Sequence, residues 1–257
     1  MGIAEQDLMG TAAGFAVDGK IPFASTFAMF ATGRAFEQIR NSIAYPKLNV
    51  KIAATHAGIT VGEDGGTHQT VEDIALMRSI PGMVVLSPAD DVEAKAALFA
   101  AAEYYGPVYI RLGRLATPTI HDENYKFELG KGEILRKGTD VAIIATGLMV
   151  AKALDAADKL EKEGINATVV NIHTIKPLDK ELIVKVAKET GKVVTVEEHS
   201  VIGGLGSAVC DVLSQEFPTK VKLIGIDDTF GQSGTANELL LHYNLTMENI
   251  MKTAKSF

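Results

Sequence analysis

Residues 48–88, "LNVKIAATHAGITVGEDGGTHQTVEDIALMRSIPGMVVLSP", decide the fold of this chain. The stretch begins with a β-rich run over residues 48–54 and ends with a second one over residues 82–88. Between them, residues 71–80 carry apolar side chains at helical spacing with acids near the start, which predicts a helix. Strand, helix and strand in succession indicate an α/β domain with a parallel sheet.

The same alternation continues on both sides of this stretch. Further β-rich runs lie at residues 21–25 and 107–112, and helical runs lie at residues 31–45 and 90–105. We therefore predict a first α/β domain over residues 1–115, with a mostly parallel sheet flanked by helices. Because the chain enters a helix almost at once, with no strand and connecting helix before it, we expect this domain to be shortened at its N-terminus.

A second α/β domain of the same architecture is predicted over residues 131–257. Residues 116–130 are mostly polar and show no sustained period, which is typical of a linker. After the linker the alternation of β-rich and helical runs resumes. The β-rich runs are residues 140–146, 167–172, 192–200 and 221–226, and a long helical run extends from about Leu148 to Glu163.

Composition narrows the class of protein. The chain has 257 residues of which 47% are hydrophobic, enough for a sizeable core. Its net charge is -7 and its basic residues are interleaved with acids, which argues against a nucleic-acid partner. No apolar run approaches the roughly 20 residues needed to cross a bilayer, so we expect no membrane association. The single cysteine, Cys210, cannot form an intrachain disulfide, so we expect a buried apolar role for it and a cytoplasmic location.

A glycine-rich loop over residues 56–69 carries polar candidates for a site. His56, His68 and Asp64 lie among four glycines, which let the backbone turn tightly and approach a ligand. His56 follows a predicted strand, where α/β sheets bind ligands, although a loop histidine is more often merely solvated. Arg114 follows another strand and could pair with a phosphate or equally with a surface acid. Chemistry alone predicts only a polar, phosphate-tolerant pocket at the strand ends.

Several segments together resemble the pyrimidine-binding domain of transketolase. In order they are "GIAEQDLMG" (2–10), "PFASTFAMFATGRAFEQIR" (22–40), "THAGITVGEDGGTHQTVEDIALMRSIPGMVVLSPAD" (55–90) and "VYIRLGR" (108–114). Residues beyond about 130, with "VVTVEEHSVIGGLGS" (193–207), resemble the C-terminal domain that follows it in transketolases and related thiamine diphosphate enzymes. The resemblance covers nearly all of the chain.

The resemblance implies thiamine diphosphate as cofactor, whose aminopyrimidine ring needs a carboxyl group to protonate a ring nitrogen. That role falls on Glu5, for which we expect burial and a raised pKa. Taken alone, a carboxylate at a helix N-terminus is also explained by the helix dipole. Phe27 and Phe30 match the family's phenylalanines, whose faces would stack on the ring, although their spacing also suits ordinary helix packing.

The resemblance also assigns substrate contacts. His56 and Arg114 would hold the phosphate of a sugar phosphate, and Asp64 would bind a substrate hydroxyl. His68 would lie near the reacting carbonyl and carry a proton, which makes it the second catalytic candidate beside Glu5. The other histidines lack such support and are expected to be structural: His121, His173, His199 and His242.

The diphosphate end of the cofactor has no recognisable site in this chain. The superfamily holds the diphosphate and its divalent metal with "GDG" and a distant asparagine; here "EDGG" (63–66) lacks that asparagine, and "GGLG" (203–206) is a weak signal. We therefore predict no metal ligands here and a partner, the N-terminal transketolase subunit, that holds the diphosphate and Mg²⁺. A site formed between chains favours self-association into a dimer and a heterotetramer with the partner.

The predicted reaction transfers a two-carbon ketol unit from a ketose phosphate to an aldose phosphate, in pentose phosphate metabolism, and needs the partner chain. Two related enzymes are alternatives: a 1-deoxyxylulose-5-phosphate synthase, which tends to carry arginine at the position of His56, and the beta subunit of a 2-oxo-acid dehydrogenase. A non-catalytic assembly subunit is a third alternative. The presence of Glu5, Phe27, His56, Asp64 and His68 weighs against it.

Overall fold

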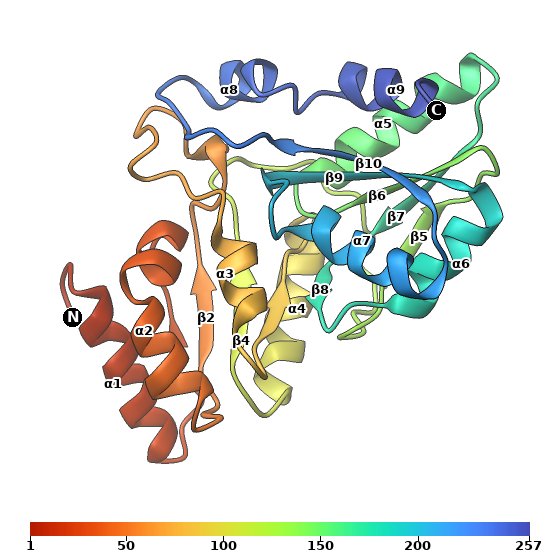
Figure 1. The fold of residues 1–257 in the computed structure, drawn as a ribbon. Helices are drawn as coiled ribbons and strands as arrows, with labels where there is room; N and C mark the ends of the chain where they lie inside the picture. Colours follow the sequence, from red (N-terminus) through yellow and green to blue (C-terminus); the bar gives the residue numbers. More distant parts are fainter.

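Two five-stranded sheets organise the chain in the computed structural model, which describes residues 1–257 (Figure 1). The first sheet has the order β1-β2-β4-β3-β8, in which β1 to β4 pair in parallel and β8 runs antiparallel to β3. Its strands are β1 (Phe23–Ala24), β2 (Lys51–Ala54), β3 (Val84–Leu86), β4 (Val108–Arg111) and β8 (Thr174–Lys176). Because β8 comes from the second half of the chain, one short strand ties the two halves together.

The second sheet has the order β10-β9-β6-β7-β5, and only β5 runs antiparallel to its neighbour. Its strands are β5 (Glu133–Arg136), β6 (Val141–Ala145), β7 (Ala167–Asn171), β9 (Lys192–Ser200) and β10 (Lys220–Ile226). The predicted fold class, two α/β domains with mostly parallel sheets, is confirmed. The predicted boundaries at 115 and 131 remain a prediction.

Helices cover both sheets (Figure 1). The first half contains α1 (Glu5–Val17), α2 (Phe36–Gln38), α3 (Asp73–Ser79) and α4 (Asp91–Glu103), with π-helical turns at Phe30–Arg34 and Ile39–Ala44 and a 3₁₀ turn at Ile59–Val61. The second half contains α5 (Met149–Lys162), α6 (Lys180–Thr190), α7 (Leu205–Glu216), α8 (Ala236–His242) and α9 (Met247–Lys255). None of these helices is long and apolar enough to cross a membrane.

Burial on both faces explains the sequence pattern of the strands. Every residue of β2, β3, β4, β6 and β7 is buried, so these strands read as nearly unbroken apolar runs. In the second half, α5 and α9 lie on one face of the sheet while α6 and α7 lie on the other (Figure 1). The parallel strands of each sheet end at a common edge, where polar side chains of the two halves meet.

Two sequence predictions need correction here. The helix predicted over residues 31–45 is broken into π-helical turns around α2. Cys210, predicted to be buried, is a free thiol that is only partly buried on α7.

His173 supplies a pH dependence of stability. Its imidazole is buried against the Phe127 ring, with the ring centroids 4.2 Å apart. Burial lowers the pKa of His173 to about 4, with a smaller contribution from the charge of His121. The native chain therefore binds fewer protons than the unfolded chain, whose histidine titrates near 6.5, so the contribution of His173 to stability is complete above that pH and is lost as the pH falls towards 4.

We expect the free energy of unfolding of the parent chain, relative to that of His173→Gln, to fall by up to about 3 kcal/mol between pH 7 and pH 4. Urea unfolding of both chains at a series of pH values measures the difference. A difference between the two free energies of unfolding that stays constant from pH 7 to pH 4 would contradict the prediction.

Candidate active site

Aromatic and histidine side chains from two segments form one cluster beside the N-terminus of α1. The Phe27 ring stacks on the His56 imidazole, with centroids 3.8 Å apart and planes 9° apart. Phe30 lies 6.1 Å from Phe27, and His68 meets the Phe30 ring edge-on at 5.2 Å. All four side chains are partly exposed, so one face of the cluster is open. The structure therefore brings together four residues that the sequence places up to 41 positions apart.

Backbone pairing fixes the position of this cluster. Ala28 N–H donates to the Thr55 carbonyl at 2.7 Å, and Thr55 N–H donates to the Thr26 carbonyl at 3.0 Å. This pairing continues the parallel register of β1 and β2 and sets Phe27 beside the residue after Thr55. His56 then takes a left-handed conformation, with φ of +60°, which turns the chain out of the strand and into the loop.

Glu5 joins the cluster through an arginine that is not among the predicted site residues. Glu5 is buried at the first position of α1, and Arg34 Nη1 donates to Glu5 Oε2 at 2.9 Å. The Arg34 guanidinium also lies over the Phe30 ring, 4.6 Å from its centroid. The spacing in the sequence could have pointed to Arg34, because Arg34 follows Phe30 by about one helical turn.

The burial predicted for Glu5 is confirmed, but the direction predicted for its pKa is wrong for this chain. Burial pushes the pKa of the Glu5 carboxyl up. A hydrogen bond from its own backbone N–H and the charge of Arg34 outweigh burial, so the pKa of Glu5 lies below its ordinary value. In the absence of other molecules, Glu5 is therefore a paired carboxylate.

Arg114 and Asp64 lie together on the far side of His56. Arg114 Nη1 lies 3.5 Å from Asp64 Oδ2 and donates to the Val61 carbonyl at 2.7 Å. Both side chains are more than 40% exposed, so this ion pair is weak and open to exchange with an anion. The pKa of His56 is lowered by burial and by Arg114, against the opposing effect of Asp64. Arg114 and Asp64 thus lie near His56, and the buried Glu5 is joined to the same cluster through Arg34.

The second half of the chain anchors the loop that carries these residues. Glu198 Oε1 accepts a hydrogen bond from Thr60 N–H at 2.7 Å. A Cβ atom on Gly58 would lie 2.2 Å from the Glu198 carboxyl carbon, and Gly58 has a φ of +82°. Only glycine fits there, which explains one of the glycines of the loop.

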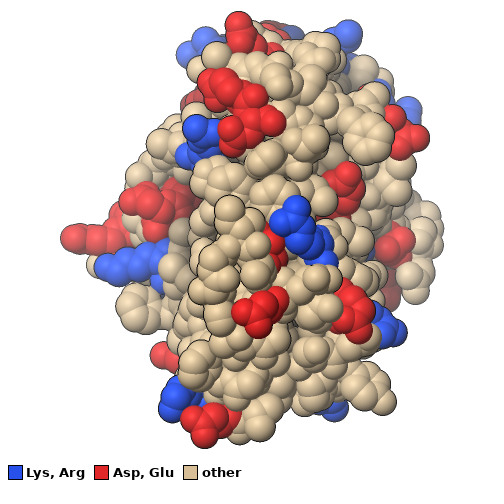
Figure 2. Space-filling model, turned by 90° about the vertical axis from the view of Figure 1, so that its left-hand side faces the viewer, with Lys and Arg blue, Asp and Glu red and all other residues tan.

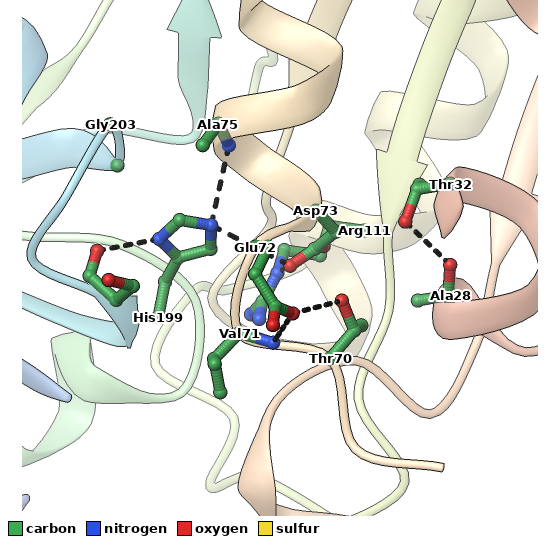
Figure 3. A network of polar contacts seen from close by, with 12 residues as sticks. Ala28, Thr32, Thr70, Val71, Glu72, Asp73, Ala75, Arg111, His199 and Gly203 are labelled. Carbon is green, nitrogen blue, oxygen red and sulfur yellow. Dashed lines mark hydrogen bonds and ion pairs between the residues drawn. The ribbon is translucent and has the colours of Figure 1, made fainter. Parts of the chain in front are cut away.

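A buried polar network lies between the two halves, behind this loop (Figure 3). Asp73 Oδ2 accepts hydrogen bonds from Arg111 Nε at 2.8 Å and from Tyr109 Oη at 2.6 Å. Arg111 Nη2 donates to the carbonyl of Glu198 at 2.9 Å. His199, predicted to be structural, is fully buried, and its Nε2 accepts a hydrogen bond from Ala75 N–H at 3.3 Å. No hydrogen bond joins this network to the cluster around Phe27, and the bond from Arg111 to the Glu198 carbonyl links the two halves.

Comparisons with known proteins cover both halves. Residues 1–119 match the family model of the transketolase pyrimidine binding domain, and residues 130–250 match that of the transketolase C-terminal domain. A putative transketolase C-terminal section from Methanocaldococcus jannaschii is 56% identical over 254 residues, which are 98% of this chain and 79% of that protein. One subunit of an apulose-4-phosphate transketolase from Phocaeicola vulgatus is 42% identical over 257 residues, which are 100% of this chain and 82% of that protein.

Among solved structures, one described as a split gene transketolase, inactive beta4 tetramer, superimposes with a TM-score of 0.94. It is 57% identical, and the match covers 99% of this chain and 82% of that one. The similarity therefore extends over both sheets and over the region around Glu5.

Proposed function

The chain belongs to the transketolase family as the C-terminal subunit of a two-chain enzyme, and we propose that it forms half of a site that transfers a two-carbon ketol unit from a ketose phosphate to an aldose phosphate. The observation that carries this proposal is the meeting of Glu5, two phenylalanine rings and two histidines on one half-open face. Such a face offers a carboxyl group, flat apolar rings and proton carriers to one small molecule.

The residues present fit the ring half of thiamine diphosphate, on which transketolases depend. When bound, this cofactor supplies the electron sink for breaking and forming a carbon–carbon bond. In the proposal, Phe27 and Phe30 flank its aminopyrimidine ring and exclude water, and Glu5 holds a proton against a ring nitrogen. A second chain covering Glu5 would favour the protonated form, because burial raises the pKa of a carboxyl group. The diphosphate and Mg²⁺ belong, in this proposal, to the N-terminal subunit.

The proposed substrate contacts come from polar side chains that lie next to the proposed cofactor ring. His56 and Arg114 donate to the phosphate of the sugar, and Asp64 accepts a hydrogen bond from a sugar hydroxyl. His68 carries a proton to or from the reacting carbonyl oxygen. The related subunit from Phocaeicola vulgatus is named for apulose 4-phosphate, so the sugar accepted by this chain stays open within the class of sugar phosphates.

Arg114→Ala, in the complex with the partner, is expected to raise KM for a phosphorylated aldose about tenfold or more, because a charge-assisted hydrogen bond to phosphate is lost. KM for the same sugar without phosphate should stay unchanged. Steady-state kinetics with both sugars measures the contrast, and Arg40→Ala, which removes another exposed arginine, serves as the matched control. An equal loss for both sugars would refute the phosphate role of Arg114.

The face around α1 suits the proposed partner. Several apolar side chains are exposed there: Ile3, Phe15, Val17, Ile21 and Phe23. Figure 2 shows this side of the molecule, where uncharged surface dominates and charged side chains are scattered across it. Such a surface is typical of a protein interface. We propose that this face takes part in the heterotetramer of two such chains and two N-terminal subunits, in the cytoplasm.

Reconstitution tests the proposed function. The chain is mixed with the N-terminal subunit, thiamine diphosphate, Mg²⁺, xylulose 5-phosphate and ribose 5-phosphate, and sedoheptulose 7-phosphate is expected. The chain alone is expected to be inactive, because half of the site is missing. Formation of 1-deoxyxylulose 5-phosphate instead would favour the synthase alternative. A well-assembled mixture that forms neither product would favour an assembly role.

A further inference from the structure

A cavity of about 420 Å³ lies between the two halves, at the carboxyl ends of β3, β4 and β6. Its wall includes Ser87 after β3, Arg111 at the end of β4, and Gly147 and Leu148 after β6. A cavity of this size holds a small metabolite, and the ends of parallel strands are where α/β proteins bind ligands. It is separate from the cluster around Phe27, none of whose side chains lines it.

Arg111 brings an unused hydrogen-bond donor to this cavity. The residue is 7% exposed, its Nε is bound to Asp73, and its Nη2 is bound to the Glu198 carbonyl. Its Nη1 donates to no protein atom. A buried guanidinium held by two of its nitrogens and open at the third is rigid, so a ligand that binds it causes little loss of side-chain entropy.

Ser87 brings a second unused polar group. The residue is 1% exposed, yet its hydroxyl forms no hydrogen bond within the protein. Its Oγ points towards Gly147, because a Cβ atom built on Gly147 would lie 3.1 Å from it. The hydroxyl oxygen is open to the cavity, where it is free to bind a ligand.

The start of α5 completes the set of donors. This helix has no side-chain cap, and the backbone N–H groups of Gly147 and Leu148 have no acceptor in the protein. Gly147 has a φ of +57° and is followed by Leu148 in the right-handed helical region, an arrangement that points successive N–H groups into one concavity. The dipole of a 14-residue helix adds partial positive charge at this point.

The acids on the cavity wall are already occupied. Both oxygens of Asp90 accept hydrogen bonds, from Glu93 N–H at the start of α4 and from the Ile120 and His121 N–H groups. Asp91 accepts a hydrogen bond from the Thr119 hydroxyl. Glu198 is buried, which raises the pKa of its carboxyl and favours the neutral form. Burial pushes the pKa of Asp90 up, but the hydrogen bonds from the Glu93, His121 and Ile120 N–H groups lower it by more, so Asp90 keeps its charge and points it at these donors. The free groups that face the cavity are mainly donors.

We propose that this cavity binds the phosphate group of a small phosphomonoester. A guanidinium nitrogen, a hydroxyl and two backbone N–H groups form four donors, which suit the three oxygens of a phosphate better than the two of a carboxylate. The apolar part of the wall, including Leu112 and Leu115, would pack against the rest of the ligand. The site is independent of the proposed function, because its test measures binding to the chain itself.

The test titrates the full chain with inorganic phosphate, ribose 5-phosphate and acetate, by calorimetry and by thermal stabilisation. The double variant His56→Ala/Arg114→Ala is used as the parent, so that the proposed substrate phosphate contacts do not contribute. We expect one site per chain for both phosphate probes and weaker binding of acetate. Absence of a phosphate site, or acetate binding as tightly as phosphate, would overturn the proposal.

Ser87→Ala is the decisive variant. It should weaken phosphate binding about tenfold, because a hydrogen bond to a charged group is lost. The unliganded chain should keep its Tm, because the hydroxyl has no protein partner to lose. Ser87→Asp should abolish binding by charge repulsion, and Ser214→Ala on the surface of α7 should change nothing. Unchanged phosphate affinity in Ser87→Ala would overturn the proposal.

Discussion

Glu5→Gln, measured in the complex with the N-terminal subunit, is expected to lower kcat by a factor of about 10² to 10⁴, the usual range for removal of a group that transfers protons. Glutamine keeps the length of the side chain and an oxygen that can accept the Arg34 hydrogen bond. It cannot hold an exchangeable acidic proton. The loss should therefore appear in kcat, while the KM for the sugar phosphates stays within a few-fold of the parent value.

Arg34→Ala separates this catalytic role from a structural one. The Arg34 side chain is 51% exposed, so its ion pair with Glu5 contributes little to stability, of the order of 1 kcal/mol or less. Removal of Arg34 should raise the pKa of Glu5, because the guanidinium charge is one reason for its low value. We therefore expect Arg34→Ala to remain active and to shift the alkaline limb of its pH–rate profile upwards, because Glu5 acts in its protonated form.

Assembly and folding are checked by gel filtration and Tm for both variants. Retention of more than a tenth of the parent kcat in a well-assembled Glu5→Gln complex would refute the proton-transfer role. If Arg34→Ala lost as much kcat as Glu5→Gln, the ion pair between Glu5 and Arg34 would account for the loss, and not a proton on Glu5.

The main strands of both sheets could be predicted because burial on two faces leaves a continuous apolar run in the sequence. β8 and β5 escaped prediction for the opposite reason. They are edge strands of three and four residues, and β8 pairs with a strand nearly 90 positions earlier in the chain. Local pattern carries no information about such pairing, so the strand that joins the two halves is visible only in the structure.

The candidate site likewise has features that could be predicted from the sequence and features that could not. Its positions could be predicted, because Phe27, His56 and His68 lie in segments with a recognisable order, and the structure brings them into contact. Their chemical roles remain predictions. The pKa of Glu5 lies below its ordinary value and not above it, because the hydrogen bond from its own backbone N–H and the charge of Arg34, 29 positions away, outweigh burial.

The buried network behind the loop could not be predicted at all. Asp73 lies in an ordinary amphipathic helix and Arg111 at the end of a strand, and neither residue type is normally buried. Their burial follows from their pairing with each other and with groups of β9, more than 85 positions further on. The two domains are therefore packed through charged groups as well as through apolar ones.

Asp73→Ala is expected to lower the free energy of unfolding by about 3 to 5 kcal/mol, because it leaves a buried guanidinium without its counter-charge. Asp73 is fully buried and accepts hydrogen bonds from both Arg111 and Tyr109, so two groups lose their partner at once. Urea unfolding monitored by circular dichroism measures the change, in buffer without phosphate. Asp158→Ala, which breaks the exposed ion pair with Arg136, is the matched control and should cost less than about 1 kcal/mol.

The double variant Asp73→Leu/Arg111→Met distinguishes loss of an attraction from exposure of an unpaired charge. If the cost of Asp73→Ala comes from the stranded charge of Arg111, removal of both charges should restore much of the lost stability. If the network is instead needed as a whole, through the bond from Arg111 to the Glu198 carbonyl, the double variant should be no more stable than Asp73→Ala. A cost for Asp73→Ala as small as that of the exposed control would show that the buried pair does not hold the two halves together.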